Sequence, residues 1–151
     1  MNSSNKKITH GFFSGYELVK EGKCFYIKCP GSTFSFPVYP KDQDILEKDM
    51  IEATIDRISG RVINDVEKCE KNPDLDLSIQ TYYARIFLRY FPTKLFGDKD
   101  FIRELNAKIS SQIFEMKLER PFTEKMKSSI QNWRTTLSSH YRREKDRDRS
   151  R

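Results

Sequence analysis

The segment that decides the fold is "DMIEATIDRISGRVINDVEKC", residues 49–69, because it fits two different periodicities. Ile51, Ala53 and Ile55 alternate with polar residues, which is the period of two expected of a half-buried strand. Ser59-Gly60 could then form a turn that leads into a return strand. The β-branched content and the central glycine favour this hairpin.

The same segment also fits a helix, because several of its apolar residues recur at helical spacing: Met50, Ile51, Ile55, Ile58 and Val62. We favour the strands and leave the helix open. On the strand interpretation, the N-terminal part forms a small antiparallel sheet of four or five strands that could close into a barrel.

The residues before this segment also predict strands. "YELVK" and "CFYIKC" flank a turn at Glu21-Gly22, and "TFSFPV" follows a second turn at Pro30-Gly31-Ser32. Pro37 places the last of these strands at a sheet edge or ends it. We therefore expect a flexible tail over residues 1–10 and a β-rich part over 11–71.

The second half predicts three helices, in a helical part that spans residues 76–144. Prolines at 92 and 121 separate three segments of helical periodicity, and "EKNPDLD" precedes the first of them. The predicted fold class is therefore α+β, with a small N-terminal antiparallel sheet packed with a C-terminal three-helix unit. The first helix carries more aromatic residues than a small bundle needs, so we expect part of it to contact the sheet or another protein.

Positive charge is concentrated at the C-terminal end of the chain. The 151 residues have a formal net charge of +6, and residues 120–151 hold 10 basic and only 4 acidic residues. A polarised basic end favours a polyanionic partner, and the alternative is a solubilising tail. We expect residues 145–151, which alternate in charge, to form a disordered basic tail.

The last predicted helix carries the candidate binding residues. Its apolar stripe, which includes Trp133, is expected to pack into the core and so to fix which residues face solvent. The basic residues that flank or follow the stripe could neutralise phosphates, and they are Lys127, Arg134, His140, Arg142, Arg143 and Lys145. For His140 a solvated surface position is the favoured interpretation, and a phosphate contact is the alternative. Gln131, Asn132 and Thr135 could contact base edges if this helix entered a groove of DNA.

Two stretches resemble a known family. "YYARIFLRYFPTKLF", a following helix and then "IQNWRTTLSSHYRRE" are similar in order to BEN domains, over about 65 residues. This resemblance implies a helical DNA-binding module of a chromatin protein. The middle segment departs from the family because it lacks the usual small-residue loop.

Nothing in the sequence predicts an enzyme, a cofactor or a metal. The chain has two histidines, His10 and His140, and neither a phosphate-binding glycine loop nor a nucleophile elbow. On a strand, Cys24 and Cys29 would point to opposite faces, which disfavours a shared zinc ion. We therefore expect a protein without catalytic activity, cofactor or metal.

The sequence also bears on location. No run of about 18 apolar residues predicts a membrane span, and the first residues do not form a secretory signal. Three cysteines suggest free thiols in a reducing compartment, so we expect an intracellular protein in the nucleus or cytoplasm.

The function expected from these patterns is nucleic-acid binding. We predict a DNA-binding regulatory protein, related to transcription, that uses its basic C-terminal helix. The alternative is an accessory or adaptor subunit of a larger protein complex. Such a subunit would bind through the aromatic helix or through the sheet edge near "FSFPV".

Overall fold

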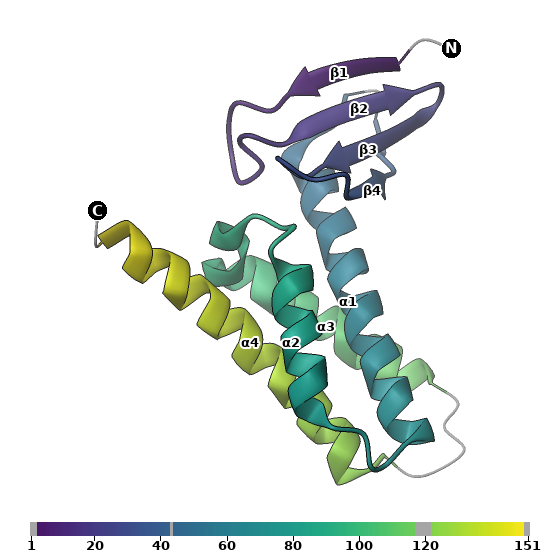
Figure 1. Cartoon of the computed structure of the whole chain (residues 1–151). Helices are drawn as coiled ribbons and strands as arrows, with labels where there is room; N and C mark the ends of the chain where they lie inside the picture. The colour runs from purple at the N-terminus through teal and green to yellow at the C-terminus, as the bar shows by residue number, and fades with distance from the viewer. Residues whose placement is uncertain (1–2, 43, 117–121, 150–151) are drawn as a thin grey trace.

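The computed structural model describes residues 3–42, 44–116 and 122–149. It has an N-terminal antiparallel sheet at one end of a helical bundle, which confirms the predicted α+β class (Figure 1). The sheet is open and does not close into a barrel, and its strands follow in chain order. They are β1 (Ser3–Lys7), β2 (Glu17–Glu21), β3 (Cys24–Lys28) and β4 (Ser35–Val38).

The first strand replaces part of the expected flexible tail. Residues 3–7 pair in antiparallel register with β2, from Ser3 opposite Glu21 to Lys7 opposite Glu17. The sequence "SSNKK" has no apolar alternation, so nothing in its side chains indicated a strand. Its edge position explains this, because pairing with β2 holds the strand while Asn5, Lys6 and Lys7 remain exposed.

The prediction of strands over residues 50–66 is wrong. This segment lies within α1 (Glu47–Lys71), so the β-rich part ends at Val38 and does not extend to residue 71. Its buried side chains recur every three or four residues over the whole helix, whereas the alternation covers only its first turns. Gly60 lies on the exposed side, where a glycine costs only about 1 kcal/mol. Acidic residues in the first turn and basic residues in the last also suit a helix.

Four α-helices and a short 3-10 helix follow the sheet in the described residues, whereas three helices were expected. After α1 come α2 (Leu77–Leu88), the 3-10 helix η1 (Thr93–Gly97), α3 (Lys99–Glu115) and α4 (Glu124–Arg149). Asp76 and Asp98 cap α2 and α3 through their side chains. Pro121, expected to separate the last two helices, lies outside the described residues. So do residues 150–151 of the expected disordered tail, while α4 includes residues 145–149.

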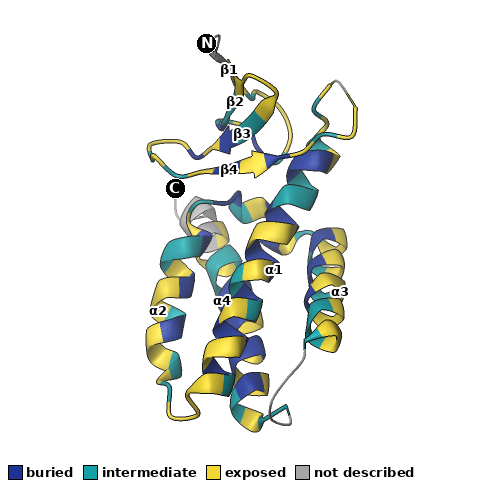
Figure 2. Ribbon diagram, turned by 90° about the vertical axis from the view of Figure 1, so that its right-hand side faces the viewer, coloured by how far each residue is buried: buried dark blue, intermediate teal, exposed yellow. Residues whose placement is uncertain are grey.

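The bundle places α1 and α4 in the middle and α2 and α3 at the outside (Figure 2). The helix α4 packs against α1, α2 and η1, and α1 also packs against α3. Trp133 of α4 is 1% exposed, so the predicted apolar stripe does form the core. None of the helices in residues 3–42, 44–116 and 122–149 has the length and apolar character needed to cross a membrane.

Polar side chains inside the bundle are paired across helices. The Trp133 indole Nε1 donates to Asp65 Oδ2 of α1 at 2.9 Å, and Ser129 donates to the side-chain oxygen of Gln80 at 3.0 Å. Burial raises the pKa of Asp65, although the Trp133 hydrogen bond and the nearby Arg61 act in the opposite direction. These contacts fix how α1, α2 and α4 fit together.

Aromatic residues join the sheet side of the molecule to the end of α2. The ring of Phe34, just before β4, stacks on Tyr90 with 4.3 Å between centroids, and Phe36 packs against Phe91 at 5.4 Å. Part of the aromatic helix region therefore contacts the sheet, as expected. The other part, including Tyr82 and Tyr83, is more than half exposed.

Candidate nucleic-acid interface

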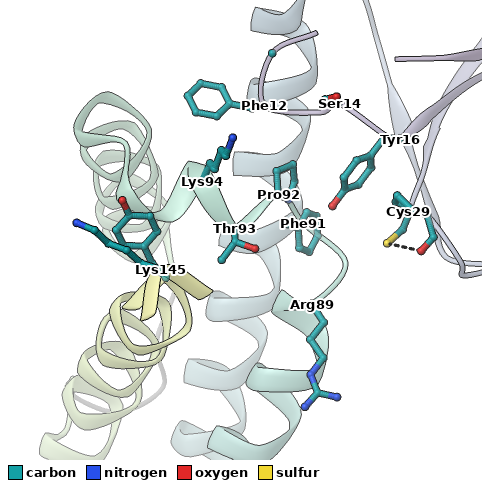
Figure 3. A pocket seen from close by; sticks show the side chains of 13 residues that line it. Phe12, Ser14, Tyr16, Cys29, Arg89, Phe91, Pro92, Thr93, Lys94 and Lys145 are labelled. Atoms are coloured by element: carbon teal, nitrogen blue, oxygen red, sulfur yellow. Dashed lines mark hydrogen bonds between the residues drawn. The ribbon is translucent and has the colours of Figure 1, made fainter. Parts of the chain in front are cut away.

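A cleft of about 550 Å³ lies between the sheet and the end of the bundle that is nearest to it (Figure 3). We call it the cationic cleft and define it by three basic and three aromatic residues: Arg89, Lys94, Lys145, Phe12, Phe91 and Tyr141. These residues come from the β1–β2 loop, the end of α2 with η1, and the last turns of α4. Its volume falls in the range of about 300–1,000 Å³ that is typical of ligand sites.

The β1–β2 loop is fixed against α1 by a carboxylate. Glu47 in the first turn of α1 accepts a hydrogen bond from the backbone N–H of Phe12. Gly11 has a φ of 82°, and a Cβ at this position would collide with the Glu47 carboxylate. The glycine therefore allows the close approach that holds Phe12 at the mouth of the cleft.

The floor of the cleft comes from the segment between α2 and η1. Arg89 ends α2, and Pro92 cannot continue the helix, so the chain turns there and enters η1 with Lys94. Gly97 at the end of η1 lies directly against the Tyr141 ring, because a Cβ there would be 2.3 Å from a ring atom. This contact seats the last turns of α4 on η1, and Lys145 follows one turn after Tyr141.

The wall on the sheet side carries no charge at neutral pH. The Tyr16 hydroxyl donates to the Tyr90 carbonyl at 2.8 Å, and burial beside Cys29 raises the Tyr16 pKa far above its usual value. Burial also raises the pKa of the Cys29 thiol, more than the neighbouring Tyr16 lowers it. Both groups therefore stay protonated, and neither is a ready nucleophile.

The electrostatic character of the cleft comes from its three basic residues. None of the lining residues that the structure describes is acidic. Figure 3 shows the Lys94 side chain reaching toward the Phe12 side, while Arg89 and Lys145 lie at separate margins. A concave surface with cations at its edges attracts anions, because the field of the cations is focused where water is partly excluded.

The structure brings half of the predicted site residues to this end of the molecule. Lys145 lines the cleft, and Arg142 and Arg143 are exposed on the preceding turn of α4. Neither of these two arginines lines the cleft.

The other three predicted residues lie elsewhere or are engaged. Lys127 forms an ion pair with Glu124 at 3.1 Å, about 27 Å along the helix axis from Lys145. The Arg134 Nε donates to the Asn106 side chain of α3 at 3.2 Å. The His140 ring packs edge-on against Phe96, 5.7 Å between centroids, so it is half-buried and not simply a solvated residue.

Sequence reasoning missed Arg89, Lys94 and Phe12. A signal for the first two was present in "RYFPTK", residues 89–94, where basic and aromatic residues interleave around a proline. Phe12 carried no such signal, because the loop reaches the cleft only through the fold. The pairing of Tyr16 with Tyr90, 74 positions apart, shows how distant the contributing segments are.

A metal centre finds no support in residues 3–42, 44–116 and 122–149, where no three His, Cys, Asp or Glu side chains gather in a way that could hold an ion. Cys24 is exposed, whereas Cys29 and Cys69 are buried, and all three are free thiols.

Comparison with protein-family models, with curated proteins and with solved structures finds no match for this chain. The resemblance to BEN domains therefore gains no support from these comparisons.

Proposed function

We propose that this protein binds nucleic acid through the cationic cleft and the neighbouring turn of α4, as a binding protein without catalytic activity. The observation that carries the proposal is that Arg89, Lys94 and Lys145, from three elements, all line one cleft, and that no acidic residue of the described part of the chain lines it. Arg142 and Arg143 are exposed on the same end of α4 and add positive charge there without lining the cleft. A role in transcription, in the nucleus, remains part of the proposal.

The cleft favours contact at the end of α4, because Tyr141 and Lys145 line it there, while the middle of the helix offers a plain exposed face. The middle of α4 packs against α1 and α2 with one face, and Gln131, Arg134 and Thr135 are exposed on the other. Asn132, one of the residues expected to contact base edges, accepts a hydrogen bond from the Thr81 side chain at 2.8 Å. A recognition helix needs an open face that can enter the major groove, and Gln131 and Thr135 lie on such an exposed face in the middle of α4.

The direct test is binding of the full chain to labelled oligonucleotides across a salt titration. Affinity should fall steeply between about 50 mM and 200 mM salt, because phosphate neutralisation releases counterions. The triple variant Arg89→Gln/Lys94→Gln/Lys145→Gln should lose most of this affinity and show a shallower salt dependence.

The matched control is Lys23→Gln/Lys71→Gln/Lys127→Gln. It removes the same charge from exposed lysines that do not line the cleft. It should bind nearly as the unmodified protein does. Absence of binding to any oligonucleotide at low salt, or equal losses in both triple variants, would contradict the proposal.

A second candidate function, as an adaptor subunit, is supported by the outer face of α2. Ile79, Tyr82 and Tyr83 are 53%, 62% and 53% exposed and lie at the spacing of one helical face. Aromatic residues of this kind are enriched in protein interfaces. A photoreactive side chain at position 82 should then cross-link to one partner protein, and Ile79→Asp should abolish that cross-link. A cross-link that persists in Ile79→Asp would contradict this function.

A further inference from the structure

The shape of the cationic cleft bears on which form of nucleic acid it can hold. Duplex DNA exposes its base edges inside a major groove about 12 Å wide, so a protein reads them with a protruding helix or ribbon. The cleft is the opposite, a recess of about 550 Å³ between the sheet and the bundle. A recess suits a base that has left the stack and can enter it.

The aromatic residues of the cleft differ in how much surface they offer. Phe91 is 2% exposed and belongs to the floor. Phe12 and Tyr141 are half-buried at the margins. The Tyr141 ring lies against Gly97, and a hydrogen bond to Glu47 fixes the backbone of Phe12. Partly exposed aromatic rings are the surfaces on which unpaired bases stack.

The positions of the charges agree with such a ligand. Lys94 reaches toward the side of the cleft where Phe12 lies, and Lys145 follows Tyr141 by one helical turn (Figure 3). Each partly exposed ring therefore has a cation near it. Paired rings and cations match the alternation of base and phosphate in a single strand.

We propose that the cationic cleft holds an unpaired nucleotide of a single-stranded nucleic acid, with its base against Phe12 and its flanking phosphates at Lys94 and Lys145. The proposal rests on the proposed function and adds the form of the ligand. The wall of Tyr16 and Cys29 stays neutral, so it neither repels the phosphates nor adds a charge that would favour a free anion.

The test compares a single strand of about 12 nucleotides, as RNA and as DNA, with the duplex of the same sequence, all bound to the full chain. The single strand should bind about tenfold more tightly than the duplex at equal salt, because only its bases can enter the cleft. A duplex that binds as tightly as the single strand would overturn this inference and leave nucleic-acid binding itself intact. Absence of binding to both would overturn both.

Variants at Phe12 separate stacking from charge. Phe12→Ala should weaken single-strand binding about tenfold without a change in the salt slope, since no charge is removed. Phe12→Trp keeps an aromatic ring at this position and should bind as the unmodified protein does. Circular dichroism of Phe12→Ala shows whether that variant is still folded. The control is Phe114→Ala, an aromatic residue that is 90% exposed and does not line the cleft. Unchanged binding in Phe12→Ala would overturn the proposal.

A free mononucleotide carries the same base and phosphate groups as a nucleotide within a strand, so its binding is measured separately. Adenosine monophosphate should bind far more weakly than the strand, because it offers one phosphate group where the strand offers several. Binding of the mononucleotide as tightly as the strand would overturn the proposal in favour of a small-molecule site.

Discussion

The two halves of α4 carry similar residues in different surroundings. In the first half, Trp133 is buried and donates to Asp65, and the basic residues Lys127 and Arg134 are engaged by Glu124 and Asn106. In the second half, Lys145 lines the cleft, and Arg142 and Arg143 are exposed. The comparison teaches that basic residues of one helix can all be exposed and still differ in surroundings, because the fold places Lys145 at a recess and Lys127 on an open face.

The largest effect on stability is expected in the first half of α4, at Trp133. Trp133→Ala should lower the free energy of unfolding by about 3–5 kcal/mol, because it leaves a cavity and removes the donor to buried Asp65. Chemical denaturation of the full chain measures this. Phe114→Ala, at a position that is 90% exposed, should change it by less than about 0.5 kcal/mol. Similar losses in both variants would mean that the buried stripe is not the core.

A smaller effect on stability is expected in the second half of α4, where Tyr141 lies against Gly97 of η1. Gly97→Ala should cost about 1–3 kcal/mol, because the new Cβ would lie 2.3 Å from the Tyr141 ring and must displace it. In a Tyr141→Ala background the same change should cost less than about 1 kcal/mol. Equal costs in the two backgrounds would show that the ring does not rest on Gly97.

The next effect is a dependence of stability on pH at Asp65, the residue of α1 that pairs with Trp133 in the first half of α4. The pKa of Asp65 is raised by burial, so its charge destabilises the fold above this pKa, and stability from this group is regained as pH falls toward the unfolded value of 3.8. Asp65→Asn keeps an acceptor for Trp133 and should lie within about 1 kcal/mol of the unmodified protein. Its advantage should grow as pH rises through the Asp65 titration.

Asp76 provides the contrast for that measurement. Its pKa is lowered by hydrogen bonds from Ser78, so it stabilises the fold above pH 3.8 and loses this contribution as pH falls. Asp76→Asn should therefore show the opposite trend with pH. The same trend in both variants, measured by denaturation over a pH series, would contradict the assignment for Asp65.

Local signals explain which parts of the fold could be predicted. The helices after residue 76 were predicted because apolar periodicity and proline boundaries are read within a few residues. The helix α1 was missed because Ile51, Ala53 and Ile55 fit both periods, and Gly60 resembles a turn residue until its exposed position is known. The strand β1 was missed because its polar side chains carry no pattern.

The candidate site was only half predictable for a different reason. Arg142, Arg143 and Lys145 stand out in the sequence because they follow an apolar stripe. Arg89 and Phe12 join them only because the sheet docks beside η1 and the end of α4, and this is a property of tertiary packing. The pairing of Glu124 with Lys127 could be expected from their spacing of three residues on a helix, whereas Asn106 meets Arg134 only through tertiary packing.

The measurement that tests the central claim most directly uses one lysine from each half of α4. Lys145→Gln and Lys127→Gln remove the same charge from the same helix, and only Lys145 lines the cleft. With a labelled single strand, Lys145→Gln should reduce the slope of log affinity against log salt by about 0.7, the value for one lost phosphate contact. Lys127→Gln should leave the slope unchanged. Equal changes in both variants, or none in either, would contradict the account.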